Sequence, residues 1–285
     1  MLGFRVGLGA WSQILTCCFS LLLSDRTMAA TKLDRFLKSK SAGFVLPFIA
    51  TVVLFAVWEL VVILFKIPPF NLPAPSSIAQ ATINFTPQLL ANSLRTLWTT
   101  LLGFLLAVGV GVVLGFMIGY SRVAYLMLYP LLVAFNTIPK AAIVPLLAIW
   151  FGANAIPATV TAFLLAFFPI AVNVALGLDT VEPEMKDVLR SLGANQVETF
   201  QKVGWPHTLP YIFASLKIAA SFAFIGAVIS ESVASNAGLG YLIVQATSDF
   251  NVPLAFAALL LLAVMGVVLY AFFVFVEKKV IYWAR

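Results

Sequence analysis

The chain has 285 residues, of which 62% are hydrophobic and only 10% are charged, and its formal net charge is +6. Soluble domains are about 45–50% apolar and about 25% charged, and burial saturates with domain size, which excludes a soluble fold of this composition. A nucleic-acid-binding protein would need a basic face on a soluble module, and the scattered lysines and arginines do not form one. The sequence therefore predicts one integral membrane domain of the all-α class.

Few residues could support catalysis or metal binding. Cys17 and Cys18 are adjacent and close to the N-terminus, where they favour neither a disulfide framework nor a metal site. His207 is the single histidine, which removes most metal sites and catalytic triads from consideration. We expect no catalytic residue and no metal site in the chain.

The first 27 residues place Arg5 before an apolar stretch, as in a signal peptide or an extra span. Either would put the lysines and arginine of residues 32–40 outside the cell, against the rule that short basic segments stay in the cytoplasm. We therefore expect translation to start at Met28, with residues 1–27 an N-terminal extension and residues 28–43 a cytoplasmic segment. The alternative is an amphipathic segment that lies on the membrane.

The first predicted span covers residues 44–65 and contains Glu59. A spanning helix needs roughly 20 apolar residues, and a charge inside the bilayer is a functional candidate by default. Two interpretations stay open: Glu59 lines a translocation path, or it is a protonated or hydrogen-bonded acid near the outer interface. Residues 71–86 follow as an external loop, with a short helix that starts at the caps Ser76 and Ser77.

The second span, residues 94–120, is rich in glycine. Gly111, Gly115 and Gly119 follow the Gly-x-x-x-Gly spacing, which permits close contact between helices. This spacing predicts packing within the subunit rather than between subunits.

The third span, residues 124–151, contains Pro130, Pro139 and Pro145, which predict a kinked or broken helix. Such a break is tolerated at membrane depth where protein or a cavity covers the backbone. Lys140 and Asn136 lie beside Pro139, where a lysine has no obvious route to the membrane surface. A cation on a translocation path would suit an anionic solute, and the alternative is a re-entrant turn near an interface.

The fourth span, residues 156–178, leads into the long loop 179–210. The pattern of a short amphipathic helix ends at Gly193, which has the place of a C′ glycine. Asn195 and Glu198 then form a capping-box pattern for a second short helix, which we expect Gly204 and Pro206 to stop. The apolar stripe of the first helix consists of Met185, Val188, Leu189 and Leu192. Such stripes fit a groove on another protein or rest on the bilayer, and periodicity alone does not decide.

The fifth and sixth spans cover residues 211–234 and 254–276. Lys217 lies early in the fifth span, and we expect it to extend to the cytoplasmic surface. Glu231 lies late in the same span among serines. It either lines a path or gate, or is a helix-end acid that reaches water.

Lysines and arginines gather before the first span and after the second, fourth and sixth, whereas the alternate loops hold few. Positive charge in short loops marks the cytoplasmic side. Both termini and the loop 179–210 should therefore be cytoplasmic.

The loop 179–210 resembles the cytoplasmic EAA loop of ABC importer permeases, whose pattern is Glu-Ala-Ala, three residues, Gly, nine residues, Ile-x-Leu-Pro. The spacing fits throughout, and the glycine and the proline are kept as Gly193 and Pro206. The acid is Asp187, and other positions depart from the pattern. The matching positions of the coupling loop are Asp187, Val188, Leu189, Gly193, Ala194, Phe200, Val203, Trp205 and Pro206.

From about residue 44 onward, further motifs resemble the nitrate/sulfonate/taurine branch of these permeases. Among them are Pro-Lys-Ala-Ala at 139–142, Trp-Phe-Gly at 150–152 and Ser-Asn-Ala-Gly-Leu-Gly-Tyr-Leu at 235–242. The resemblance implies a MetI-like, type I importer fold over residues 44–285 with about six transmembrane helices. It also favours a path role for Glu231, because the branch has an acid at this place.

The resemblance implies two permease copies in the bacterial inner membrane, most simply a homodimer, that offer their coupling loops to a cytoplasmic ATPase dimer. ATP and magnesium would bind to that ATPase and not to this chain, which has no phosphate loop. A periplasmic or lipid-anchored binding protein would deliver the solute. His207 would lie at the surface near the ATPase.

The solute stays open. We expect an anion such as a sulfonate, taurine or nitrate, with a thiamine-precursor pyrimidine or riboflavin as the alternative. The residues we expect along the path are Lys140, Asn136, Glu231 and Glu59. An ATPase-independent channel is the competing class, and an intramembrane enzyme would need convergent catalytic groups that these scattered acids do not supply.

Overall fold

The computed structural model describes residues 42–281, and every regular element in this range is a helix. The chain divides into two compact units, Met1–Lys66 and Ile67–Arg285. The predicted extension 1–27 and most of the segment 28–43 lie outside the described residues. In the first unit the described chain is α2 (Ala42–Leu64), which matches the first predicted span.

The second unit is a bundle of long helices with short helices at both ends. Five described helices, α2 among them, are long and apolar enough to cross a membrane, and the bent pair Arg122–Thr137 and Lys140–Phe151 makes a sixth span if the two helices cross together. The prediction of about six spans is confirmed, in the predicted order. The elements of the second unit are α3 (Pro75–Asn84), α4 (Thr86–Tyr120), α5 (Arg122–Thr137), α6 (Lys140–Phe151), α7 (Ala155–Asp179), α8 (Pro183–Ser191), α9 (Gln196–Thr199), the π-helical turn η1 (Phe200–Gly204), α10 (Trp205–Ala234), α11 (Leu239–Ser248) and α12 (Val252–Val280).

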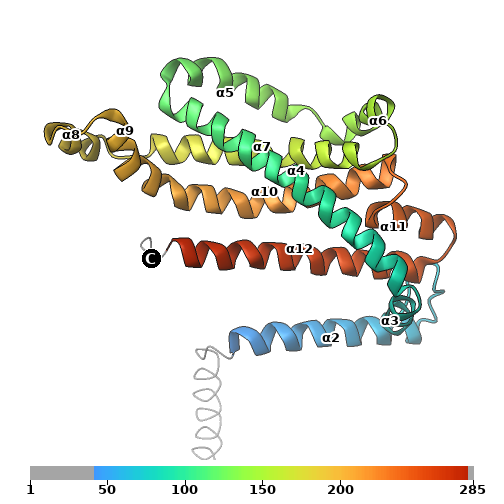
Figure 1. Ribbon diagram of the computed structural model, residues 1–285. Helices are drawn as coiled ribbons and strands as arrows, with labels where there is room; N and C mark the ends of the chain where they lie inside the picture. Colours follow the sequence, from blue (N-terminus) through green and yellow to red (C-terminus); the bar gives the residue numbers. More distant parts are fainter. Residues whose placement is uncertain (1–41, 282–285) are drawn as a thin grey trace, which may run out of the picture. The chain divides into compact units, whose positions relative to one another are not determined.

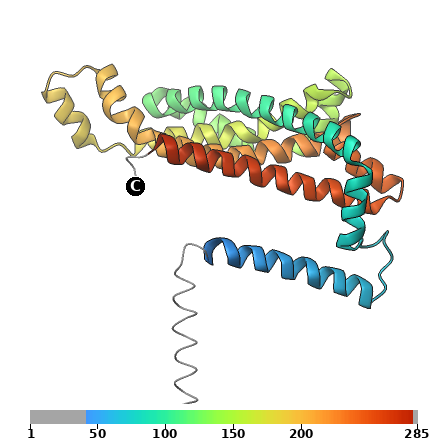
Figure 2. The same ribbon diagram turned by 60° about the horizontal axis from the view of Figure 1, so that its bottom comes forward.

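Figures 1 and 2 show α4, α7, α10 and α12 running side by side. The helices α8 and α9 extend beyond one end of this bundle, which we call the α8 end, and α6 and α11 lie at the opposite end. The core lies around α7, which packs against both α4 and α10. Small residues allow this close approach, and the buried positions of α7 include Ala162, Ala166, Ala171 and Ala175.

The glycines of α4 form the contact with α7, as their spacing predicts. A β-carbon built on Gly115 would lie 2.5 Å from the β-carbon of Val174 and 2.7 Å from the carbonyl oxygen of Ala171. Gly103, Gly111 and Gly119 meet the α7 backbone or β-carbons in the same way. The interface is therefore inside the subunit, and it has no room for side chains at these positions.

The third span is broken between α5 and α6, whose axes differ by 87°. Pro139 occupies the N-cap of α6 with an extended backbone, and the preceding Ile138 is also extended, as expected for a residue before proline. Pro130 and Pro145 remain inside helices. The predicted break is confirmed and is located at Pro139.

One local prediction was wrong. The short helix α3 has Ala74 as its N-cap and Pro75 in its first turn, so the serines at 76 and 77 lie within the helix. That Lys217 extends to the cytoplasmic surface stays a prediction: its Nζ lies 2.8 Å from Oε2 and 3.0 Å from Oε1 of Glu277, near the end of α12. An acid 60 positions away stabilises this cation and ties α10 to α12.

Candidate functional site

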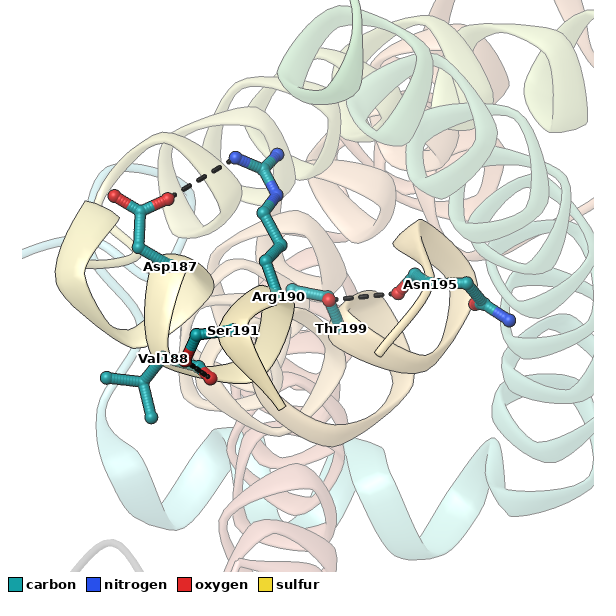
Figure 3. A network of polar contacts seen from close by, with 6 residues as sticks. All are labelled: Asp187, Val188, Arg190, Ser191, Asn195 and Thr199. Carbon is teal, nitrogen blue, oxygen red and sulfur yellow. Dashed lines mark hydrogen bonds and ion pairs between the residues drawn. The ribbon is translucent and has the colours of Figure 1, made fainter. Parts of the chain in front are cut away.

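The loop between α7 and α10 begins with α8. Pro183 occupies the first turn, where its missing N–H and fixed φ suit a helix start. Glu184 in the first turn and Arg190 in the last turn both interact favourably with the helix dipole. Arg190 Nη1 also lies 3.4 Å from Asp187 Oδ1 (Figure 3), an exposed pair that contributes little to stability.

A glycine turn ends α8. Gly193 has φ +85°, and its N–H donates to the carbonyl of Arg190 at 2.9 Å. The N–H of Ala194 donates to the carbonyl of Leu189 at 3.0 Å. These two bonds make a Schellman motif with glycine at C′, as predicted. A side chain at Gly193 would force a left-handed backbone on an ordinary residue, so the turn depends on glycine.

The next helix starts with a reciprocal capping box. Glu198 N–H donates to Asn195 Oδ1 at 2.9 Å, and Asn195 N–H donates to Glu198 Oε2 at 2.8 Å. Thr199 adds a bond from its hydroxyl to the carbonyl of Asn195 at 2.9 Å (Figure 3). The cap predicted at Asn195 is confirmed.

The expectation that Gly204 and Pro206 stop this second helix was wrong. The chain continues from α9 through the π-helical turn η1 into α10, and Val197–Ala234 forms one span-length helical stretch. The N–H of Trp205 bonds to the carbonyl of Phe200, five residues back. The wider turn accommodates Pro206, which lies at the start of α10, where a proline is tolerated.

An aromatic cluster joins this turn to α4. The ring of Phe116 on α4 stacks on Trp205 at a centroid distance of 5.6 Å and meets Phe200 edge-on at 5.4 Å. Gly204 is buried, and a β-carbon there would lie 3.0 Å from the Phe200 ring. We call Phe116, Phe200 and Trp205 the loop-base cluster. It anchors η1 on the bundle.

The outer helix α8 instead presents an apolar stripe to its surroundings. Met185, Val188 and Leu192 are 49%, 58% and 77% exposed. In Figure 3 the Val188 side chain points away from the turn that follows α8. The predicted coupling-loop positions thus fall into two groups. Asp187, Val188 and Gly193 are exposed, as is Trp205 at 40% although it packs on the cluster. The half-buried group consists of Leu189, Ala194, Phe200, Val203 and Pro206.

Among the predicted path residues of the second unit, Glu231 shares no hydrogen-bond partner with Asn136 and Lys140 in the described part of the chain. Glu231 is only 1% exposed and accepts hydrogen bonds from Thr96 at 2.7 Å and Thr99 at 3.2 Å, both on α4. It also accepts one at 3.2 Å from the N–H of Gly240, in the first turn of α11. Within one subunit this carboxylate therefore lies in a closed network that joins α4, α10 and α11. Sequence reasoning missed Thr96 and Thr99, and no local pattern marks partners more than 130 positions away.

Lys140 and Asn136 do lie together, at the bend between α5 and α6. Lys140 Nζ donates to the backbone carbonyl of Asn136 and, at 2.8 Å, to its side-chain Oδ1.

Glu59 lies in α2, and its path role stays a prediction. His207 is half-buried, and its Nε2 lies 3.3 Å from the Thr180 hydroxyl.

Residues 107–282 match the family of binding-protein-dependent transport system inner membrane components. This match covers more than half of the chain. The chain is an ABC importer permease of this family. Its long apolar helices agree with a multi-pass protein of the inner membrane.

Several relatives resemble the permease over most of their length. A formylaminopyrimidine transport permease of Halalkalibacterium halodurans is 30% identical over 84% of this chain and 96% of its own. An aliphatic sulfonates transport permease of Bacillus subtilis is 28% identical over 86% and 89%. A riboflavin transport system permease of Chloroflexus aurantiacus is 32% identical over 82% and 88%. Permeases with such different named solutes share this sequence pattern, so family membership gives the machinery and leaves the solute undetermined.

Permeases of this family work with a separate ATPase subunit and a solute-binding protein.

Proposed function

We propose that this permease imports a small nutrient anion, of the sulfonate, taurine or nitrate kind, across the bacterial inner membrane. The energy comes from ATP hydrolysed by a cytoplasmic ATPase dimer that binds α8. ATP and magnesium bind to that ATPase and not to this chain. Two copies of the permease pair in the lipid bilayer, and a binding protein on the outer side delivers the solute.

The observation that carries this proposal is the exposed stripe of α8. Helices that lie in a groove of another protein present apolar anchors at i, i+3 and i+7, which is the spacing of Met185, Val188 and Leu192. Three side chains of this size, once covered, each contribute about 1.5–3 kcal/mol of transfer free energy before the cost of association. The Schellman turn and the capping box fix the geometry of the loop, so little ordering is needed when a partner binds.

Packing contacts connect the base of the α8 loop to the long helices, and movement of the loop can be transmitted through them. The loop-base cluster connects η1 to α4, and the glycine interface connects α4 to α7. When the ATPases close on ATP, they displace the loops, and the loops move these helices between inward-open and outward-open arrangements. The coupling thus depends on packing, which explains why aromatic and glycine residues recur along this route.

The test is recovery of the ATPase with the tagged permease from native membranes, in mild detergent. Leu192 is 77% exposed, so its substitution costs the permease fold almost nothing. We expect Leu192→Asp to lower ATPase recovery by about tenfold or more, because it places a charge in the apolar contact. Leu192→Met is the matched control at the same position and should recover the ATPase normally.

A normal yield of ATPase with Leu192→Asp would show that the stripe is not the docking surface. If the unmodified permease brings no ATPase at all, a channel that works without one becomes the better account. If Val188→Asp behaves like Leu192→Asp, the contact covers the whole stripe rather than its last residue.

A further inference from the structure

A cavity of about 340 Å³ lies beside the bend between α5 and α6. Its polar lining consists of Lys140, Asn136 and Asn173, and its apolar lining includes Phe168 of α7 and Phe222 of α10. Ligand pockets start at about 300 Å³ and combine an apolar wall with a few convergent polar groups. The cavity therefore has the size and the mixed lining of a site for a small molecule.

The cavity lies beside the middle of the length of α7 and is open to the surface of the subunit. Phe168 and Asn173 are close to the middle of α7 (Ala155–Asp179), the helix at the centre of the core. Lys140 is thus far from either end of α7, which argues against a lysine at the membrane surface. A charge at such a depth is expensive unless it is paired or lines a pathway.

The two intramembrane lysines differ in how they are stabilised. Lys217 is paired with the Glu277 carboxylate at 2.8 Å. Lys140 has no carboxylate oxygen within 4 Å among the described residues, and its ammonium group donates only to neutral oxygens of Asn136. Neutral acceptors hold the ammonium group in place without cancelling its charge. The first residue of α6 is Lys140 itself, so the positive end of that helix adds to the potential.

A proline adds polar groups to the same wall. Pro169 lies inside α7 and cannot donate to the carbonyl of Leu165, and both residues line the cavity. Asn173 Nδ2 donates to the carbonyl of Pro169 at 2.8 Å, which fixes the amide on this wall. No other described residue bonds to the second N–H or to the oxygen of this amide, so both can bind a ligand.

A second cavity, of about 500 Å³, continues from the first toward the α8 end. Both are lined by Val172, and the α7 residues of the two, from Leu165 through Phe168, Val172 and Leu176 to Asp179, recur at helical spacing along one face. Arg122 and the stacked rings of Tyr125 and Tyr129 line this second cavity. One face of α7 thus lines both cavities, with Lys140 beside the first and Arg122, together with the acid Asp179, beside the second.

We infer that the permease itself holds its solute at the α5–α6 bend, with the Lys140 ammonium and the Asn173 amide on an oxyanion group and Phe168 and Phe222 on a compact apolar body. The ligand class is a small organic anion such as a sulfonate. The solute then leaves along the α7 face past Arg122. The inference rests on the proposed function and adds a selecting site within the membrane to the one on the binding protein.

The probe is ethanesulfonate, added to the purified full chain in detergent and followed by saturation-transfer NMR of its ethyl protons. We expect saturable binding that the neutral isostere ethyl methyl sulfone does not show. Lys140→Met and Asn173→Asp should each weaken binding by about tenfold or more, because a charge-assisted contact is lost or a repulsive charge is added. Lys140→Arg keeps the charge and should keep binding, and Lys186→Met, a cation of the α8 loop, is the matched control.

A charge reversal distinguishes loss of the site from loss of the fold. Lys140→Glu should stop ethanesulfonate binding and create binding of ethylammonium, which a misfolded protein would not do. Equal binding by the unmodified chain and Lys140→Met, or loss only in Lys186→Met, would overturn the site. ATPase recovery is measured on the same samples: recovery without anion binding rejects this site and leaves the proposed function, whereas binding without recovery rejects the function and leaves the site.

Discussion

Glu231 shows how a carboxylate is held among helices of a membrane protein. Its two oxygens accept two hydroxyl donors from α4 and one backbone donor from α11. Thr96 in turn accepts the N–H of Leu239 at 2.8 Å, so the first turn of α11 has its unpaired N–H groups satisfied by side chains of α4 and α10. The residue stabilises the position of α11, and any path role would require this network to open.

Truncation of Glu231 should therefore destabilise the fold. Glu231→Ala leaves the hydroxyl of Thr96 and the N–H of Gly240 without the acceptor they have now, whereas Thr99 keeps the carbonyls of Arg95 and Thr96. We expect a loss of about 3 kcal/mol of unfolding free energy. Glu231→Gln keeps the shape but replaces one acceptor oxygen by a donor, so a smaller loss is expected. Thermal unfolding of the purified protein in detergent measures both.

The control for Glu231 is its neighbour Ser232, whose hydroxyl bonds only to the carbonyl of Val228 in the same helix. Ser232→Ala should change the unfolding free energy by no more than about 0.5 kcal/mol. If Glu231→Ala has the same unfolding temperature as Ser232→Ala and the unmodified chain, the carboxylate does not stabilise the fold. A direct role in the path then gains support.

At the scale of elements, the contact of α4 with α7 depends on the absence of side chains. Gly115→Ala would place a methyl group 2.5 Å from the β-carbon of Val174, and the two helices would have to separate. We expect a loss of about 1–3 kcal/mol, as for other overpacked interfaces. Gly109 lies on the same helix with nothing within 4 Å of a built β-carbon, which makes Gly109→Ala the matched control.

Gly109→Ala should be neutral or slightly stabilising, because alanine is the better helix former. Thermal unfolding of the two variants in the same detergent tests the interface. Equal unfolding temperatures would mean that the α4–α7 contact accommodates an added methyl group, and that the close packing at Gly115 does not stabilise the fold.

The helices were predictable where lipid and local chemistry dictate them. A span must be long and apolar, and a capping box or a C′ glycine acts within a few residues, so the spans and the turn around Gly193 were predicted from the sequence. A kink or break in the third span was predicted too, but not which of its three prolines would cause it. The continuation of α9 into α10 was not predictable, because Gly204 and Pro206 usually end helices, and only the π-helical turn and its packing on Phe116 overrule them. The partners of Glu231 and Lys217 were not predictable either, since tertiary folding alone brings such distant residues together.

At the scale of the whole molecule, sidedness can be tested directly. We propose that the α8 end faces the cytoplasm, because the basic loops lie there. Glu184 on α8 and Ala153, between α6 and α7, are both exposed and lie at opposite ends of their spans. In a chain without Cys17 and Cys18, Glu184→Cys should react with a membrane-impermeant maleimide only in inverted vesicles.

Ala153→Cys is the matched control and should react in intact spheroplasts instead. The reverse pattern of labelling would place α8 outside the cell, where no ATPase could reach it, and would contradict the proposed coupling.

The glycine interface has a mechanical consequence. Helices whose backbones touch cannot slide over each other without large separations, so α4 and α7 behave as a single rigid lever, and Phe116 fastens that lever to the turn at the base of the loop. A displacement of α8 is therefore transmitted along the whole bundle, because α4 and α7 bend little. The conformational change must therefore occur at another, more flexible position. The two residues between α5 and α6, Ile138 and Pro139, form a hinge that can supply it, directly beside Lys140.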